Sequence, residues 1–349
     1  MSVLKFKFKK LDLLVPLFVW SFWLLLMVAR NQWHLFVDNW FMSVTMAVGS
    51  FIAGSTSEGG GAVAFPVMTL MFDIEPAVAR DFSLMIQSVG MTSATIAIFV
   101  NRIAIEPRAL LFSSLGGALG IMFSLEYIAP LLPPVVTKLF FVTLWLSFGV
   151  ALLSMNRDRQ RVLNKRISGF QRQDMLVLIA VGLVGGMVSG ITGSGLDILT
   201  FSLLVLAFRL DEKIATPTSV VLMAVNALVG FGWRVFFSST PVLPETWSYW
   251  WVSVPVVVIG APLGAKFIAN RSNLFVIYLL LTTIILQFGA ALLILPLTHN
   301  LMLFSAATFL VGFCFFSVMN YSGYQRLLSN RQNVKDIIIR ETAVSESHK

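Results

Sequence analysis

The chain has 349 residues, of which 57 % are apolar and 12 % are charged, and Lys and Arg outnumber Asp and Glu by 25 to 17. Soluble domains carry about 45–50 % apolar and about 25 % charged residues. This composition therefore excludes a soluble globule, a disordered protein and a fibrous protein. The positive charges gather in short segments between apolar runs, as in the cytoplasmic loops of membrane proteins, which argues against nucleic acid as a partner. We predict an all-α polytopic membrane protein.

The N-terminus combines a basic segment, residues 5–10, with an apolar stretch over residues 11–29. A cleavable signal peptide has an apolar region of about 7–15 residues. The stretch found here is longer, so we predict a retained first transmembrane helix with its N-terminus in the cytoplasm.

Seven further apolar runs approach the roughly 20 residues that a bilayer crossing requires. They cover residues 77–100, 109–130, 134–155, 215–237, 247–268, 274–296 and 301–321. With the first helix they give about eight full transmembrane helices. Two other apolar regions, 40–72 and 175–208, are interrupted by glycine and hydroxyl residues over 54–61 and 190–197. Their arms, at about 12–16 residues, are short for full crossings.

The distribution of Lys and Arg indicates how the two interrupted regions are placed. If both are re-entrant broken-helix hairpins, all of the 25 Lys and Arg residues lie on the cytoplasmic side except Arg30, Arg80, Lys138 and Arg234. If each were a single crossing, the basic loop over residues 157–172 would face outward. Cytoplasmic loops are enriched in Lys and Arg, so we predict hairpins. Arg80 and Arg234 could attract an anion, although snorkelling to the interface is the more common explanation.

The two interrupted regions are also related in sequence. Shifting the chain by 136 positions places Gly54 on Gly190 and Thr56 on Thr192. Three predicted crossings separate the first hairpin from the basic loop, so the two hairpins enter from opposite sides and form an inverted-topology repeat. The expected organisation is a basic cytoplasmic N-terminus with the first helix (1–39), a first repeat (40–155), a basic cytoplasmic loop (156–174), a second repeat (175–321) and a cytoplasmic tail (322–349).

Each break exposes backbone N–H groups where its second arm begins. The start of a helix carries a partial positive charge and unpaired donors, which together favour an anion. Glycines admit a ligand close to the backbone, and hydroxyl groups donate further hydrogen bonds. The alternative is that the glycines only allow helices to pack closely. The candidate substrate-binding residues are Ser55, Thr56, Ser57, Gly59, Gly60, Gly61, Thr192, Ser194, Gly195, Gln87 and Asn226.

Four polar residues within the predicted membrane segments have two interpretations each. Glu58 and Asp197 lie in the breaks, where burial disfavours a charged acid, so they are proton-coupling candidates; capping of the second arms explains them equally well. Gln87 and Asn226 lie in the helices that follow the hairpins. Their amides either face the substrate cavity or bond neighbouring helices without a further role.

The sequence offers no catalytic or metal-ligating set. Cys314 is the single cysteine and the three histidines are far apart, so no thiolate or imidazole cluster is expected. Neither break is followed by Lys-Ser or Lys-Thr, which excludes a phosphate-binding loop of that type. We predict no catalytic residues, no metal and no cofactor.

These motifs resemble those of the TauE/SafE (TSUP) family of membrane transporters. The resemblance rests on the glycine motif over 54–61 with Pro66, its copy over 190–195, the segment 215–219 with Asn226, and the segment 260–265. It covers about residues 40–320 and implies about eight membrane helices in two related halves. The resemblance also implies transport of small anions such as sulfite, thiosulfate, sulfoacetate and related organosulfur compounds. Glu58 and Asp197 depart from the usual pattern of the family.

The leading hypothesis is a secondary transporter of small sulfur-containing anions that works by alternating access, with proton coupling as a further expectation. One alternative is a carrier of carboxylates or other small organic anions. A non-transporting membrane scaffold is less favoured, because it would leave the acids in the breaks unexplained. The expected partners are a small anionic substrate and the lipid bilayer, and a homo-oligomer is left open. The expected location is the plasma (cell inner) membrane, with both termini in the cytoplasm.

Overall fold

The computed structural model describes residues 10–56, 59–156, 163–269, 271, 273–295 and 298–347, and these residues form helices and no β-strand. The α-helices are α1 (Lys10–Arg30), α2 (Leu35–Asp38), α3 (Trp40–Ser55), α4 (Gly59–Pro66), α5 (Pro76–Val100), α6 (Pro107–Phe123), α7 (Pro134–Asn156), α8 (Arg172–Thr192), α9 (Leu196–Ser202), α10 (Glu212–Phe236), α11 (Pro244–Ala269), α12 (Asn273–Ile294) and α13 (His299–Ser347). Three π-helical segments and one 3₁₀ segment extend them: η1 (Val67–Met71), η2 (Ser124–Ile128), η4 (Leu203–Ala207) and the 3₁₀ segment η3 (Ala129–Leu131).

Eight helices among the described residues are long and apolar enough to cross a membrane, which confirms the all-α polytopic fold class. They are α5, α6 with its continuation to Leu131, α7, α8, α10, α11, α12 and the part of α13 up to Arg326. Their identity differs from the expected set in two respects. α1, the expected first crossing, is not among the eight, because its stretch Leu14–Arg30 counts only as a shorter apolar helix, whereas α8 is among them. The 21-residue α8 is longer than the arm predicted for the second hairpin. Its glycines do not interrupt it, because the helix packs closely along α6 and breaks only after Thr192.

The second hairpin, α8 followed by α9 and η4, begins and ends on the same side of the bundle. The N–H of Asn164, before α8, donates to the carbonyl oxygen of Arg209, after η4, at 2.8 Å. Arg326 of α13 also joins the two ends. It pairs with Asp174 in the first turn of α8, and its guanidinium carbon lies 4.6 Å from the ring centroid of Phe208. We call the side of Asn164 and the start of α8 the loop side.

The first hairpin, α3 followed by α4 and η1, begins and ends on the other side. The ring of Phe41, in the first turn of α3, lies 4.2 Å from that of Phe72, directly after η1, and 5.8 Å from that of Tyr249 in α11. α10 begins on the loop side and ends here, where its Arg234 pairs with Asp81 near the start of α5 at 2.6 Å. We call this the cavity side. The hairpins therefore open on opposite sides, as in an inverted-topology repeat.

The two halves interlock, because the first arm of each hairpin packs on a helix of the other half. α3 packs along α11, and α8 packs along α6. The backbones approach closely at glycines. A Cβ on Gly54 would lie 2.0 Å from the carbonyl oxygen of Ala261, and a Cβ on Gly186 would lie 2.2 Å from that of Gly117. Such contacts between small residues are usual in membrane bundles, and they give the motif glycine Gly54 a packing role.

The second arms, α4 and α9, both contact α7 in the core. The ring of Phe65 in α4 lies 5.1 Å from that of Phe141, and the ring of Phe201 in α9 lies 6.2 Å from that of Phe148. Phe65 and Phe201 are equivalent under the shift of 136 positions. α7 is therefore a common wall for the two hairpins.

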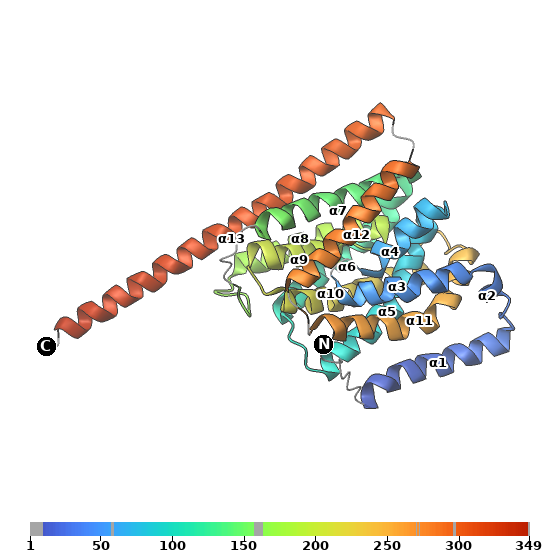
Figure 1. Ribbon diagram of the computed structural model, residues 1–349, viewed down its shortest axis with the longest axis horizontal. Helices are drawn as coiled ribbons and strands as arrows, with labels where there is room; N and C mark the ends of the chain where they lie inside the picture. The colour runs from blue at the N-terminus through green and yellow to red at the C-terminus, as the bar shows by residue number, and fades with distance from the viewer. Residues whose placement is uncertain are drawn as a thin grey trace.

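α1 and α13 lie at the periphery of the bundle (Figure 1). The indole N–H groups of Trp20 and Trp23 in α1 donate to backbone carbonyl oxygens of α11 at 2.9 and 2.8 Å. α13 has 49 residues and extends far beyond the other helices at its C-terminal end (Figure 1). At 1.5 Å per residue its length is about 74 Å, and it continues without a break through the boundary expected at residue 322.

Candidate functional site

The first hinge joins α3 to α4. The hydroxyl groups of Ser55 and Thr56 donate to backbone carbonyl oxygens one turn earlier, at 2.7 and 3.0 Å. The three glycines at 59–61 form the first turn of α4. Two predicted site residues, Ser57 and Glu58, lie outside the described residues.

The second hinge, residues 192–195, is a sharp turn from the last residue of α8 to the start of α9. Gly193 has φ +83°, a left-handed conformation that favours glycine. A Cβ at Gly193 would lie only 2.5 Å from the Cβ of Ser83 in α5. The hydroxyl of Thr192 closes the turn, since it lies 2.7 Å from the carbonyl oxygen of Ser194. Nothing in the sequence distinguishes Gly193 from its neighbouring glycines, because the need for a positive φ is visible only in the folded turn.

Asp197 lies at the start of α9 and binds the hinge from within. Its carboxylate accepts the N–H of Gly195 at 2.7 Å and the hydroxyl of Ser194 at 2.9 Å. The N–H of Leu196 donates to the hydroxyl of Ser189 at 3.0 Å. These donors, which we expected to face an anionic ligand, are therefore bonded to the protein. The arrangement is that of a helix cap, and proton coupling by Asp197 stays a prediction.

The two mid-span amides border the second hinge. Gln87 of α5 donates from Nε2 to the carbonyl oxygen of Gly193 at 3.0 Å. Asn226 of α10 is buried, and its Oδ1 atom has no hydrogen-bond partner. That oxygen lies 3.4 Å from the position of a Cβ on Gly117, which also faces the side chain of Leu196. A buried carbonyl oxygen without a hydrogen-bond donor is unfavourable. Asn226 therefore indicates a place for a ligand or water that donates a hydrogen bond to it.

The predicted substrate-binding residues therefore divide between two places. Thr192, Ser194 and Gly195 lie in the second hinge, and Gln87 and Asn226 lie beside it. Ser55 and Thr56 lie at the end of α3, where α11 packs closely.

The sequence did not predict a cluster of buried charged residues near the second hinge. Arg80 and Asp81 of α5 and Arg234 of α10 are buried and line a cavity of about 420 Å³ together with Ile191 of α8. The side chains of Arg80 and Arg234 turn inward to Asp81, which overturns snorkelling as the explanation for them. No sequence signal joins Asp81 to Arg234, because 153 positions separate them.

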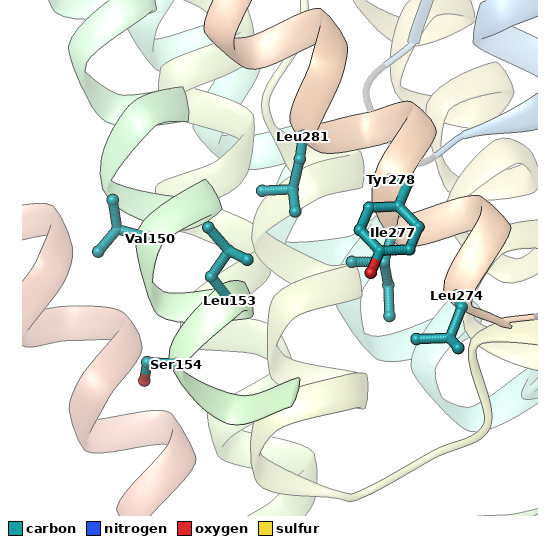
Figure 2. Close-up of a pocket in the computed structure, with 7 residues that line it drawn as sticks. All are labelled: Val150, Leu153, Ser154, Leu274, Ile277, Tyr278 and Leu281. Carbon is teal, nitrogen blue, oxygen red and sulfur yellow. The ribbon is translucent and has the colours of Figure 1, made fainter. Parts of the chain in front are cut away.

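A second cavity, of about 360 Å³, lies between α7 and α12. Figure 2 shows Leu153 of α7 and Leu281 of α12 extending into the space between the two helices. Among the described residues of its wall, hydroxyl groups belong to Ser154 and Tyr278 and no side chain is charged. This described lining does not have the chemistry of an anion site.

The sequence model of the sulfite exporter TauE/SafE family matches residues 41–292, well over half of the chain. The chain belongs to the TauE/SafE family. No curated protein and no solved structure matches it. The matched region begins in α3 and ends in α12, so it contains both hairpins and the interlocked helices between them.

Membership of the TauE/SafE family implies a membrane transporter, because the members of this family are transporters rather than enzymes. It also confirms the resemblance that the glycine motifs suggested. Within this TauE/SafE chain the segment 260–265 lies on α11, where Gly260 and Gly264 face Ser50 and Phe51 of α3. The hydroxyl of Thr218, in the segment 215–219, accepts the N–H of Glu106 at 2.9 Å. These motifs join the two halves of the transporter.

Proposed function

We propose that this TauE/SafE protein is a secondary transporter of small sulfur-containing anions, of the sulfite, thiosulfate or organosulfonate class, and that it works by alternating access. The observation that carries the proposal is the pair of broken hairpins that open on opposite sides of the bundle within the region of family similarity. Broken helices in inverted repeats hold substrates near the membrane midplane in many transporters. Membership of a sulfite exporter family supports the sulfur class of substrate.

The second hinge is the proposed substrate contact. It holds two hydroxyl groups, those of Thr192 and Ser194. The unpaired amide oxygen of Asn226 lies near Gly117, which faces the side chain of Leu196 directly after the hinge. A hydroxyl that now donates within the protein can rotate to an oxyanion. The oxygen of Asn226 can accept a hydrogen bond from a hydrogensulfite-like acid or from a water that accompanies the anion. Thiosulfate and sulfonates offer the same oxygen acceptors as sulfite.

Asp197 is the proposed coupling group. Its carboxylate occupies the N–H of Gly195 and the hydroxyl of Ser194, two donors that a substrate oxyanion would use. A charged Asp197 would also repel an anion that binds the same donors. Protonation of Asp197 would remove the repulsion and weaken its hold on both donors, so that proton and anion would move together.

Counterflow in proteoliposomes tests the transport function. Purified protein is reconstituted, and exchange of radiolabelled sulfite and thiosulfate is measured, with succinate as the dicarboxylate control. We expect exchange of the sulfur anions, and we expect Gly193→Ala to abolish it, because a Cβ there strains the positive φ and collides with Ser83. The matched control is Gly289→Ala in α12, where a Cβ would meet no atom within 4 Å.

Succinate exchange without exchange of either sulfur anion would replace the substrate class by carboxylates and would keep the transport mechanism. Silence for all three anions in protein that remains folded would contradict the proposal and favour a scaffold. Equal loss in Gly193→Ala and Gly289→Ala would remove the hinge from the mechanism.

We also propose that the protein lies in the plasma membrane with its loop side facing the cytoplasm. The support is the density of Lys and Arg around the start of α8 and after η4. Labelling by a membrane-impermeant maleimide of intact cells tests it, with Ser168→Cys on the loop side and Ser239→Cys on the cavity side in a Cys314→Ser background. We expect only the cavity-side cysteine to react, and the reverse pattern would invert the topology.

A further inference from the structure

The buried charges on the cavity side do not balance. Asp81 Oδ1 accepts Nε and Nη2 of Arg80 at 2.9 and 2.8 Å. Asp81 Oδ2 lies 2.6 Å from Nη2 of Arg234. Arg80, Asp81 and Arg234 are only 7 %, 4 % and 6 % exposed. Two cations therefore share a single carboxylate inside the bundle.

The two arginines differ in how far their donors are used. All three nitrogens of Arg234 are engaged, since Nη1 donates to the hydroxyl groups of Ser238 and Thr240 at 2.7 and 2.9 Å while Nε and Nη2 bind Asp81. Arg80 directs its bonds to one oxygen of Asp81, and its Nη1 has no protein partner among the described residues. A buried guanidinium with donors to spare is a ready partner for an oxyanion, because its planar fork matches two oxygens at once.

The cavity that these residues line borders α8 close to the second hinge. Its volume of about 420 Å³ is in the range of small-molecule sites. Its wall includes Ile191, two residues before Gly193, and a Cβ on Gly193 would lie 2.9 Å from the carbonyl oxygen of Arg80. The remaining charged residue of the lining is Glu75, which is exposed at the rim. A ligand held by Arg80 would therefore lie next to the hinge without touching Asp197.

We propose that the cavity is a second anion-binding site, an entry site in which a small divalent or monovalent oxyanion binds Arg80 in competition with Asp81. The anion supplies the negative charge that the cluster lacks, and Asp81 holds the two arginines in place when no anion is bound. The inference rests on the proposed function for the identity of the anion, and on the charges and the cavity for the site itself. Because Asp81 also ties α5 to α10, an anion that displaces it loosens the cavity side.

Opposite substitutions test the competition. The half-saturating concentration of thiosulfate, KM, is measured in counterflow for Arg80→Gln, Asp81→Asn and the wild type. Loss of a charged hydrogen-bond donor should raise KM roughly tenfold in Arg80→Gln with little change in kcat. Asp81→Asn should lower KM, because it removes the competing charge and keeps the side-chain shape. Arg102→Gln is the control, because Arg102 is exposed in the turn after α5 and its loss removes the same charge.

A merely structural ion pair gives a different result. Both substitutions would then lower the unfolding temperature and the amount of folded protein, and KM would stay unchanged in both. That outcome overturns the proposal, as does a tenfold rise in KM for Arg102→Gln. If Arg80→Gln does not fold, the sign of the KM change in Asp81→Asn alone decides.

A binding measurement separates this inference from the transport function. Thiosulfate should raise the unfolding temperature of Asn226→Leu, in which the proposed hinge contact is lost, because a ligand that binds only the folded state stabilises it. Adding Arg80→Gln to that variant should remove the rise. Absence of transport with the rise retained would leave the entry site standing and contradict the transport function. If the protein transports anions but Arg80→Gln changes neither KM nor the rise in unfolding temperature, the transport function stands and the entry site is contradicted.

Discussion

The two hairpins share a sequence pattern, and each begins and ends on one side of the bundle. The contacts that hold their breaks in place nevertheless differ. The break of the first hairpin follows Gly54, which lies against the backbone of α11. The break of the second is bound by side chains, Asp197 within the hinge and Gln87 across from α5. A backbone contact is rigid, whereas hydrogen bonds can exchange partners. Under the proposed function, this difference assigns the response to substrate and protons to the second hinge and leaves the first arm as a fixed frame.

The largest expected effect tests the rigidity of that frame. Gly54→Ala would put a Cβ 2.0 Å from the carbonyl oxygen of Ala261. The equivalent Gly190→Ala would put one 2.6 Å from the Cβ of Ser124, a side-chain atom, and 3.1 Å from the carbonyl oxygen of Ile121. We expect Gly54→Ala to lower stability by about 3 kcal/mol or more and Gly190→Ala by clearly less, since overpacking is costly where no side chain can move.

Yield of monodisperse protein and its unfolding temperature measure the difference between these two variants. Gly232→Ala, where a Cβ would meet no atom within 4 Å, is the control and should behave as the wild type. Equal losses in Gly54→Ala and Gly190→Ala would show that the two first arms are equally rigid and would end the distinction between frame and hinge.

The second prediction concerns the cap of α9. Asp197→Ala should lower stability by about 1–2 kcal/mol, the usual effect of losing a helix cap, and Asp197→Asn by less, since an amide oxygen still accepts the N–H of Gly195. Both variants should lose the pH dependence of thiosulfate transport if Asp197 carries the proton. Transport that keeps its pH dependence in Asp197→Asn would limit Asp197 to capping.

The third prediction contrasts the two amides beside the hinge. Gln87→Leu leaves the carbonyl oxygen of Gly193 without its donor, so it should lower stability by about 1–3 kcal/mol. Asn226→Leu removes a buried oxygen that has no partner, so it should leave stability unchanged or raise it. Transport should fall in both. Unfolding temperatures and counterflow rates check this, and unchanged transport in Asn226→Leu would remove it from the substrate site.

Hydropathy and charge alone predicted most of the fold. Apolar run lengths predicted seven of the eight membrane-capable helices among the described residues, with α1 in place of α8 as the eighth. The distribution of Lys and Arg predicted that each hairpin returns to its own side, which the contacts of Phe41 with Phe72 and of Asn164 with Arg209 bear out. The length predicted for the first arm of the second hairpin, α8, was wrong. Glycines that would interrupt a helix in water are tolerated where a second helix packs on them. The length of a hairpin arm therefore depends on the helix that packs against it, which the local sequence does not reveal.

The site was less predictable than the fold. Glycines and hydroxyl groups marked the hinge segments, but the direction of a hydroxyl proton depends on which acceptor lies nearest after folding. Gly193 was not separated from its neighbouring glycines, since only its backbone angle distinguishes it. The pairing of Asp81 with Arg234 arises because α5 and α10 pack together. The charge count treated Arg80 and Arg234 only as charges on one side of the membrane, so it could not predict this pairing.

The smallest expected effect concerns how the hairpins end. The first returns at Asp73, whose exposed carboxylate pairs with Lys138 of α7 at 2.9 Å, whereas the second returns at Arg209, which donates to Asn320 of α13. The hydrogen bond and the positive charge of Lys138 lower the pKa of Asp73 below its ordinary value of 3.8. The pair therefore stabilises the fold fully above pH 3.8, and this contribution is lost as the pH falls through the lowered pKa.

Exposure and salt screening keep the contribution of such a pair small. Asp73→Asn should lower the unfolding temperature slightly at neutral pH, and the difference from the wild type should vanish in acid and at high salt. Lys138→Met and the double variant complete a cycle, in which the double variant should lose no more than Lys138→Met alone. A large loss in Asp73→Asn would mean that the end of the first hairpin, and not only its contact with α11, fixes the frame.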